Sequence, residues 1–378
     1  MIVMTPRARE YAYLLVGGVF FFVLLAFIVP RAVSQTISRD SQMADEKPLP
    51  VEHLPMPQSV KGIYMTSFTA GNAKLLVPVL AILKTTEINS IVVDIKDYSG
   101  KISYAIDDKS IASLGVIEKR VPDMPALLHT LHSMGIYVIG RVAVFQDPFM
   151  VQKRPELAVK RASDKRMVWQ DHKGVSWIDP GSREYWKYIV SIAQAAYATG
   201  FDEINFDYIR FPSDGNMNDI YYPESDGKVK AQVIKDFFAY LHKELSGTGL
   251  TISADIFGMT TTNTDDLNIG QILENALPYF DAVAPMVYPS HYPPGFNNYK
   301  NPAEKPYEVV RYSMDKAFAR ASTTPQKLRP WLQDFNLGAT YTADMVRAQI
   351  KATTDAGFTS WLLWNPRSVY TKGALLPK

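Results

Sequence analysis

The sequence predicts an α/β protein of the (β/α)8 TIM-barrel class, preceded by an N-terminal transmembrane helix and a Pro-rich linker. Three observations favour this fold class. From residue 61 onward, short strand-like runs alternate with helical runs, a pattern typical of parallel α/β folds. The fragments HSMGIYV, YATGFDEI and TDAGFTSW each join a helix end to a strand through a glycine, at Gly135, Gly200 and Gly357. Polar side chains follow nearly every strand-like run.

Eight strands are expected within the barrel domain, which we place at residues 61–378. They fall at 61–68, 90–97, 136–145, 203–211, 250–258, 281–288, 328–335 and 359–364. The helices between them are expected at 72–86, 123–134, 182–199, 229–246, 268–278, 306–321 and 342–356. A doubly wound open sheet is the alternative. The first turn, TSFTAGN, lacks the Gly-rich pattern that such sheets often carry, so the barrel is favoured.

The first residues predict a membrane anchor. Residues 11–29 carry no charge and just reach the ~20 apolar residues that a membrane-spanning helix requires. Arg7 and Arg9 precede this run and favour a cytoplasmic segment at 1–10, followed by an anchor at 11–30. The expected location is therefore the cell membrane, in a single pass, with the C-terminal domain outside the cytoplasm.

Two further features of this region affect the predicted location. Ala32-Val33-Ser34 would make a small-residue cleavage site, so secretion after signal cleavage is the alternative. Residues 31–60 are polar and contain Pro48, Pro50, Pro55 and Pro57, which predicts an extended, stiff linker. Such a linker would hold the barrel away from the membrane surface.

The composition excludes several classes of function. The net charge is +2 and no basic run is present, so a nucleic-acid partner is not expected. The chain has no cysteine, which excludes disulfides, thiolate catalysis and zinc–cysteine sites. Phosphate-binding loops, H-E-x-x-H, G-x-S-x-G and dinucleotide-binding patterns are absent, and the six histidines show no metal-ligand spacing. Neither a cofactor nor a metal is therefore expected.

The stretch FDEINFDYIRFP, residues 201–212, carries the clearest sign of a site. Alternate residues of a strand face opposite sides, so Ile204 and Phe206 face the helices while Asn205 and Asp207 face the interior. A buried carboxylate requires partners. Other strands end in polar or aromatic groups too: Asp94, Lys96, Asp97, Arg141, Gln146, Asp147, Asp255, Tyr288, His291, Gln333, Asp334, Trp364 and Asn365. Because barrel active sites lie at this end of the strands, we expect a site there.

Carboxylates among aromatic rings favour glycoside hydrolysis. This reaction needs two carboxyl groups beside the scissile bond, and sugars stack on aromatic rings while their hydroxyls bind polar groups. A Schiff-base mechanism would need a strand-end lysine, and Lys96 is the one candidate. Its neighbours Asp94 and Asp97 would keep it charged, which disfavours that role.

The domain resembles the putative glycoside hydrolase domain family, an α-amylase-like barrel type found in bacterial membrane-anchored proteins. The motifs that carry the resemblance are KGIYMTS, VVDIKDYSG, GRVAVFQDP, GFDEINFDYIRFP, SADIFG, APMVYPSHY, RPWLQDF and WLLWNP, and they span nearly all of residues 61–366. The resemblance implies a glycosidase that acts on an extracellular or cell-envelope polysaccharide or oligosaccharide. A non-catalytic glycan-binding barrel is the alternative.

The resemblance also implies roles for individual residues. Read across by strand, the nucleophile would be Asp207 and the general acid Asp255, in a retaining mechanism, with a further Asp at Asp334. Asn205 stands where the related enzymes carry arginine, and Asp255 stands where they usually carry glutamate. The residues expected to bind substrate are Asp94, Lys96, Arg141, Asn205, Tyr288, His291, Trp331, Gln333, Asp334 and Trp364.

Overall fold

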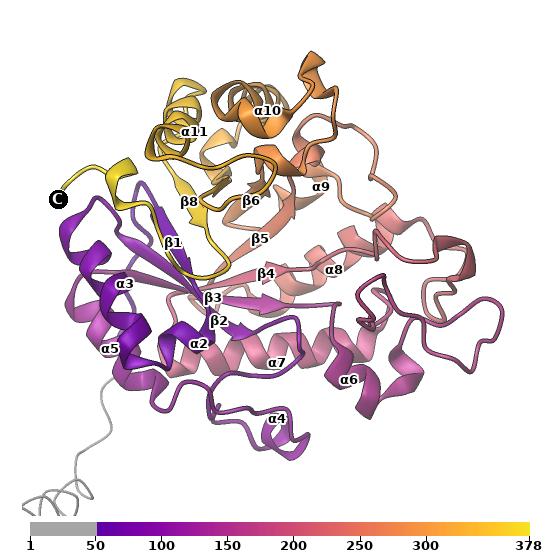
Figure 1. Cartoon of the computed structure of the whole chain (residues 1–378). Coiled ribbons are helices and arrows are strands. Elements are labelled where there is room, and N and C mark those ends of the chain that lie inside the picture. The colour runs from indigo at the N-terminus through magenta and orange to yellow at the C-terminus, as the bar shows by residue number, and fades with distance from the viewer. Residues whose placement is uncertain (1–50) are drawn as a thin grey trace, which may run out of the picture. The chain divides into compact units, whose positions relative to one another are not determined.

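The computed structural model describes residues 51–378, and the predicted N-terminal segment, anchor and first part of the linker lie outside these described residues. The described part is a closed barrel of eight parallel strands, paired in chain order from β1 to β8. The prediction of a (β/α)8 barrel is therefore confirmed. The helices surround the strands in Figure 1. Within residues 51–378, no helix is both long and apolar enough to span a membrane.

The strands lie close to their predicted positions. They are β1 (Lys61–Met65), β2 (Ser90–Lys96), β3 (Tyr137–Ala143), β4 (Glu203–Asp207), β5 (Thr251–Phe257), β6 (Ala282–Met286), β7 (Trp331–Gln333) and β8 (Trp361–Trp364). Most are shorter than expected at their C-terminal ends. In β4 the cause is Tyr208, whose backbone is left-handed at φ 54° and ends the strand four residues before the predicted boundary.

The longer helices also agree with the sequence. They are α3 (Ala73–Thr85), α5 (Met124–Ser133), α7 (Arg183–Thr199), α8 (Lys230–Leu245), α10 (Pro306–Ala321) and α11 (Ala343–Asp355). The predicted helix at 268–278 is only one turn, α9 (Leu273–Ala276), and the short α2 (Ser67–Ala70), α4 (Lys109–Ser113) and α6 (Pro148–Lys153) were not expected. Ser182 caps α7 at its start, and Gly200 ends it at φ 118°.

The strand sequences explain how the barrel holds polar groups. All seven residues of β2 are buried, and Ile91, Val93 and Ile95 belong to the apolar layer between strands and helices. Residues at the alternate strand positions face the barrel interior, and a second cluster there contains Tyr64, Val92, Ile139 and Trp331. Strand register then aligns Asp94 with Arg141 and Arg141 with Asn205 across β2, β3 and β4. These three polar side chains therefore meet inside the barrel.

The lower part of the barrel holds an ion pair that the sequence did not suggest. Arg329 pairs with Glu203, and both side chains are almost fully buried. Tyr137 and Ser253 donate to the same carboxylate. The pair closes the barrel interior below the site, since Glu203 lies two residues before Asn205 on the inward face of β4.

Residues 51–60 pack on the barrel, although the sequence predicted them as the end of the linker. The His53 ring stacks on Tyr197 at 4.0 Å between centroids, and the Leu54 N–H donates to Asp202 at 2.7 Å. Val60 is buried and its N–H donates to Ser360. The packed domain therefore begins before residue 61.

Candidate active site

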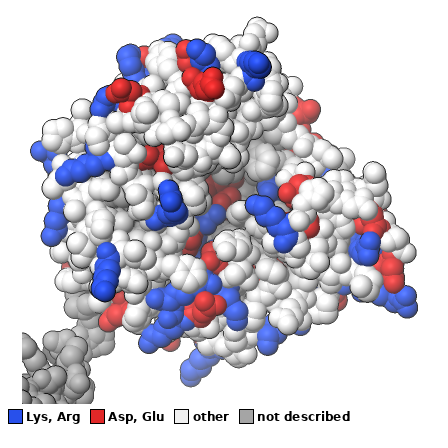
Figure 2. Space-filling model, in the orientation of Figure 1, with Lys and Arg blue, Asp and Glu red and all other residues white. Residues whose placement is uncertain are grey.

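A cavity of about 350 Å³ opens at the C-terminal end of the strands. In Figure 2 a hollow in the centre of the visible face contains both acidic and basic side chains. The cavity is lined by Arg141, Asp207, Tyr208, Arg210, Asp255, Phe257, Gly258, Met259, Met286, Tyr288, His291, Tyr292 and Trp364. Both carboxylates predicted to carry the chemistry, Asp207 and Asp255, are thus in its wall.

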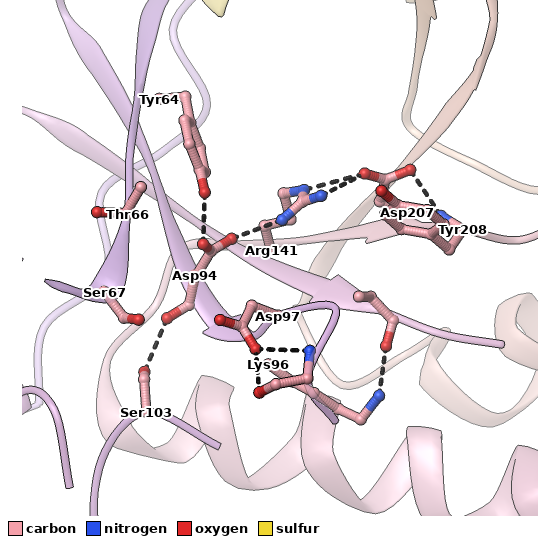
Figure 3. Close-up of polar contacts among 12 residues, drawn as sticks. Tyr64, Thr66, Ser67, Asp94, Lys96, Asp97, Ser103, Arg141, Asp207 and Tyr208 are labelled. Atoms are coloured by element: carbon pink, nitrogen blue, oxygen red, sulfur yellow. Dashed lines mark hydrogen bonds and ion pairs between the residues drawn. The ribbon is translucent and has the colours of Figure 1, made fainter. Parts of the chain in front are cut away.

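Arg141 holds Asp207 in place. Its Nε and Nη2 both donate to Asp207 Oδ2, at 3.1 and 2.6 Å. Its Nη1 donates to Asp94 Oδ1 at 2.7 Å, and the Tyr64 hydroxyl donates to the other oxygen of Asp94. Figure 3 shows this continuous chain of contacts. Because the Tyr208 N–H donates to Asp207 Oδ1, both oxygens of Asp207 are bound and its carboxylate is fixed in one orientation.

Asp255 has a different environment. It is 1 % exposed, and the guanidinium of Arg141 pairs with Asp94 and Asp207 instead. Its Oδ1 accepts from the Asn205 amide at 2.9 Å and from the Trp331 indole at 2.7 Å. Burial, followed by the negative charge of Asp207, raises the pKa of Asp255 to about 8. At neutral pH Asp255 therefore holds a proton, while Asp207 is bound to a guanidinium.

Two carboxyl groups that share a cavity but differ in their environments can divide acid and nucleophilic roles. One supplies a proton to a leaving oxygen, and the other attacks or stabilises the electron-poor carbon. The Asp255 Oδ2 atom has no hydrogen-bond partner among residues 51–378, so it is free to meet a group in the cavity. This arrangement suits cleavage of a glycosidic bond.

The turn after β4 contributes two cavity residues that the sequence predictions did not include. Tyr208 has a positive φ of 54°, an uncommon conformation for a residue with a large side chain. Its ring lies edge-on to Trp177 at 6.0 Å, and its side chain lines the cavity together with Arg210. The FDYIRFP motif was the available signal, because it places both residues within three positions after Asp207.

Comparison with known proteins identifies the family of this domain. Residues 62–370 match the model of the family described as "Putative glycosyl hydrolase domain". The chain belongs to this family. The predicted family is therefore confirmed, and so is the prediction of an enzyme of the glycosyl hydrolase class. No curated protein sequence matches the chain significantly.

Two of the similar solved structures show the fold of this glycosyl hydrolase domain. The glycoside hydrolase domain of PgaB (BpsB) from Bordetella bronchiseptica is 13% identical with a TM-score of 0.63, over 82% of this chain and 95% of that one. An α-galactosidase from Thermus thermophilus is 13% identical with a TM-score of 0.51, over 85% and 60%. A hypothetical protein from Ruminiclostridium thermocellum is 36% identical over 51% of this chain and 96% of its own, with a TM-score of 0.47.

The structure of the glycosyl hydrolase domain brings most predicted site residues together. Arg141, Tyr288, His291 and Trp364 line the cavity with the two catalytic candidates. Asp94, Asn205 and Trp331 lie just beneath it, where they bind Arg141 or Asp255. His291 is exposed at the rim of the cavity, and partial desolvation there lowers its pKa below the usual value.

Three predicted site residues of this domain lie elsewhere. Lys96 is fully buried outside the cavity, where it donates to the Ala143 carbonyl and pairs with Asp147 at 3.0 Å. Figure 3 shows it apart from the Asp94–Arg141–Asp207 chain. Gln333, the last residue of β7, accepts from the Ser290 N–H and donates to the Phe335 carbonyl, so it ties together the loops after β6 and β7. Asp334 accepts from the Thr371 N–H and hydroxyl, which anchors the C-terminal segment.

Several other cavity residues were not predicted. Phe257, Gly258, Met259, Met286 and Tyr292 come from the ends of β5 and β6 and from the turns after them. None of them carries a charged group, so nothing in the sequence distinguished them from core residues. Within residues 51–378, no group of three or more histidine, aspartate or glutamate side chains is placed to hold a metal ion.

Proposed function

We propose that this domain hydrolyses glycosidic bonds with retention, using Asp207 as nucleophile and Asp255 as general acid. The observation that carries the proposal is the contrast between the two carboxyl groups of one cavity. Asp207 is bound by a guanidinium and Asp255 has a pKa raised to about 8. A retaining hydrolase needs this difference, since one carboxyl must attack while the other donates a proton.

The hydrogen bonds around each carboxyl group support these roles. Arg141 and the Tyr208 N–H hold Asp207 from both sides, which would orient the nucleophile without removing its charge. The Asn205 amide and the Trp331 indole bind one oxygen of Asp255 and leave the other for the leaving group. After attack, the deprotonated Asp255 would activate the water that releases the sugar.

The remaining cavity wall favours a carbohydrate. Tyr208, Tyr288 and Trp364 present aromatic rings to the cavity, and Phe257 and Met286 add apolar surface. Sugar rings bind such surfaces through their C–H faces. We propose that the substrate is a polysaccharide of the cell envelope and that the domain works outside the cytoplasm, on the basis of the apolar run at residues 11–29.

The test is hydrolysis by the purified full-length chain. It would be incubated with fractionated envelope polysaccharides, and the anomer first released would be followed by proton NMR. Asp207→Asn should abolish hydrolysis, while Asp344→Asn, an exposed change at the start of α11, should not. Glycan binding with no turnover by the parent protein would contradict the proposal and favour a binding module.

A further inference from the structure

Arg210 is a buried arginine with no acidic partner in the described part of the chain. It is 9 % exposed and lines the cavity. Its Nη1 donates to the Phe211 carbonyl at 2.9 Å and to the Ser213 hydroxyl at 3.2 Å. The other buried arginines of residues 51–378 are Arg141 and Arg329, and each forms an ion pair with a buried carboxylate.

An unpaired buried guanidinium is unfavourable unless something compensates for its charge. Arginine stays protonated in proteins, so the charge cannot be removed by titration. Burial lowers the pKa of Arg210 from its usual value, whereas Asp207 and Asp94 raise that of Arg141 despite its burial. Nothing in the described fold therefore neutralises Arg210 as Asp207 neutralises Arg141.

The residues around Arg210 orient the plane of its guanidinium but do not neutralise its charge. The guanidinium carbon lies 4.8 Å from the ring centre of Trp177, 4.8 Å from that of Phe257 and 5.5 Å from that of Tyr208. Such cation–π contacts orient the group and exclude water around it. Together with the two Nη1 hydrogen bonds, they leave the opposite edge of the guanidinium free.

That free edge is formed by Nε and Nη2. Neither atom has a hydrogen-bond partner among residues 51–378. Both atoms remain accessible to solvent, since neither is among the fully buried polar atoms without a partner. The Nε–H and one N–H of Nη2 point the same way in a guanidinium, as a parallel pair. This pair matches two oxygens of a carboxylate or a phosphate.

The carboxylates nearest to Arg210 are already engaged or exposed. Asp207 is bound by Arg141, and Asp171 accepts from the Trp177 indole and from two backbone N–H groups. Asp214 is exposed on the loop that follows, and Asp255 keeps its proton at neutral pH. Among residues 51–378 no carboxylate is left to pair with the free edge, so an anion from outside these residues could occupy it.

We propose that Arg210 binds an oxyanion carried by the sugar, so that the substrate is an acidic glycan with a carboxylate or a phosphate ester beside the cleaved bond. This inference rests on the proposed glycosidase function, because it assigns a substituent to the substrate of the same cavity. Arg210 would act as a specificity-determining residue, and the hydrolysis itself would still depend on Asp207 and Asp255.

The test measures binding, so that it does not depend on turnover. The full-length Asp255→Asn protein, whose amide resembles the protonated acid, would be titrated calorimetrically with acidic oligosaccharides. The probes are oligogalacturonate, oligomannuronate and hyaluronan oligosaccharides, the methyl esters of each, and a glycerol phosphate oligomer. At least one carboxylate probe should bind about tenfold or more tightly than its ester, given the strength of charged hydrogen bonds. If only the phosphate oligomer is preferred, the oxyanion that Arg210 binds on the substrate is a phosphate ester.

Variants of Arg210 show whether this residue causes the preference. Introducing Arg210→Gln into the Asp255→Asn protein should remove the preference for the acidic probe. Arg210→Lys in the same protein should keep part of the preference, because a lysine retains the charge without the paired donors. Arg367→Gln, an exposed change in the loop after β8, should leave it intact. Circular dichroism would show that each variant is folded.

Two results would overturn the inference. One is equal binding of the acidic probes and their esters together with no binding of the phosphate oligomer, and the other is a preference that persists in Arg210→Gln. Hydrolysis of a neutral polysaccharide by the parent protein, combined with either result, would leave the proposed glycosidase function standing. The two proposals therefore fail separately.

Discussion

The indole N–H of Trp331 donates to Asp255 Oδ1 at 2.7 Å, from β7 to β5 across the barrel interior. A hydrogen bond to the carboxylate oxygen stabilises the charged form and lowers the pKa, whereas burial and the charge of Asp207 raise it. The result is a pKa of about 8 rather than a carboxyl that never ionises. Trp331 therefore makes it easier for Asp255 to release its proton.

The first prediction concerns the pH dependence of activity. The general acid must be protonated, so kcat/KM should fall as pH rises through about 8, the pKa of Asp255. Trp331→Phe removes the donor that lowers this pKa, so the alkaline limb should move to higher pH. Trp361→Phe, a buried change outside the cavity lining, should leave the limb in place. An unmoved limb in Trp331→Phe would show that another group titrates.

The second prediction separates the two carboxyl roles by leaving group. Asp255→Asn should slow cleavage of an unactivated glycoside by about 10²- to 10⁴-fold, since general acid catalysis contributes that much. Cleavage of a dinitrophenyl glycoside of the same sugar should slow much less, because its leaving group needs no proton. The measurement is kcat/KM for both substrates, which reports the step in which the leaving group departs, whereas kcat would also report the later water attack that Asp255 assists. Equal losses on both would assign Asp255 a role other than proton donor.

The third prediction concerns the stability of the charged cluster. Arg141→Met leaves Asp94 and Asp207 buried without their shared cation, which should lower the free energy of unfolding by about 3–5 kcal/mol. Arg154→Met removes only surface pairs with Glu156 and Glu184, and its cost should stay below ~1 kcal/mol. Urea denaturation measures both. Similar values for the two variants would mean that the buried cluster adds no stability.

Much of the barrel could be predicted from the sequence because its signals are local. The glycine at the end of α7 and the buried run of β2 depend on neighbouring residues only. Strand parity on β4 was equally local, and it placed Asn205 and Asp207 inside the barrel as expected. These features can be predicted from neighbouring residues, without knowledge of contacts between distant segments.

The rest of the site depends on contacts between distant segments. Lys96 and Asp94 stand two residues apart on β2, yet the register irregularity between them directs Lys96 to Asp147 rather than to the cavity. The presence of Asn205 where an arginine was expected also reflects a contact between strands. The resemblance implied an arginine at this position, whereas the guanidinium that binds Asp207 belongs to Arg141 on β3, which strand register aligns with Asn205. A single sequence does not reveal that the cation for a carboxylate comes from the neighbouring strand.

The last prediction concerns the close approach of two strands at the cavity edge. Gly258 follows β5, and a Cβ there would lie 2.3 Å from the Met286 carbonyl oxygen and 2.9 Å from the Tyr292 hydroxyl. Gly258→Ala must therefore push β5 and β6 apart, at a cost of about 1–3 kcal/mol, and displace the cavity residues Phe257 and Met286. Thermal unfolding should show a lower Tm, and kcat/KM should fall with it. Gly373→Ala, whose Cβ would lie 3.7 Å from the nearest atom, should change neither. A Gly258→Ala protein with the parent's Tm and kcat/KM would show that this edge of the cavity can yield, so that its close packing does not set the shape of the site.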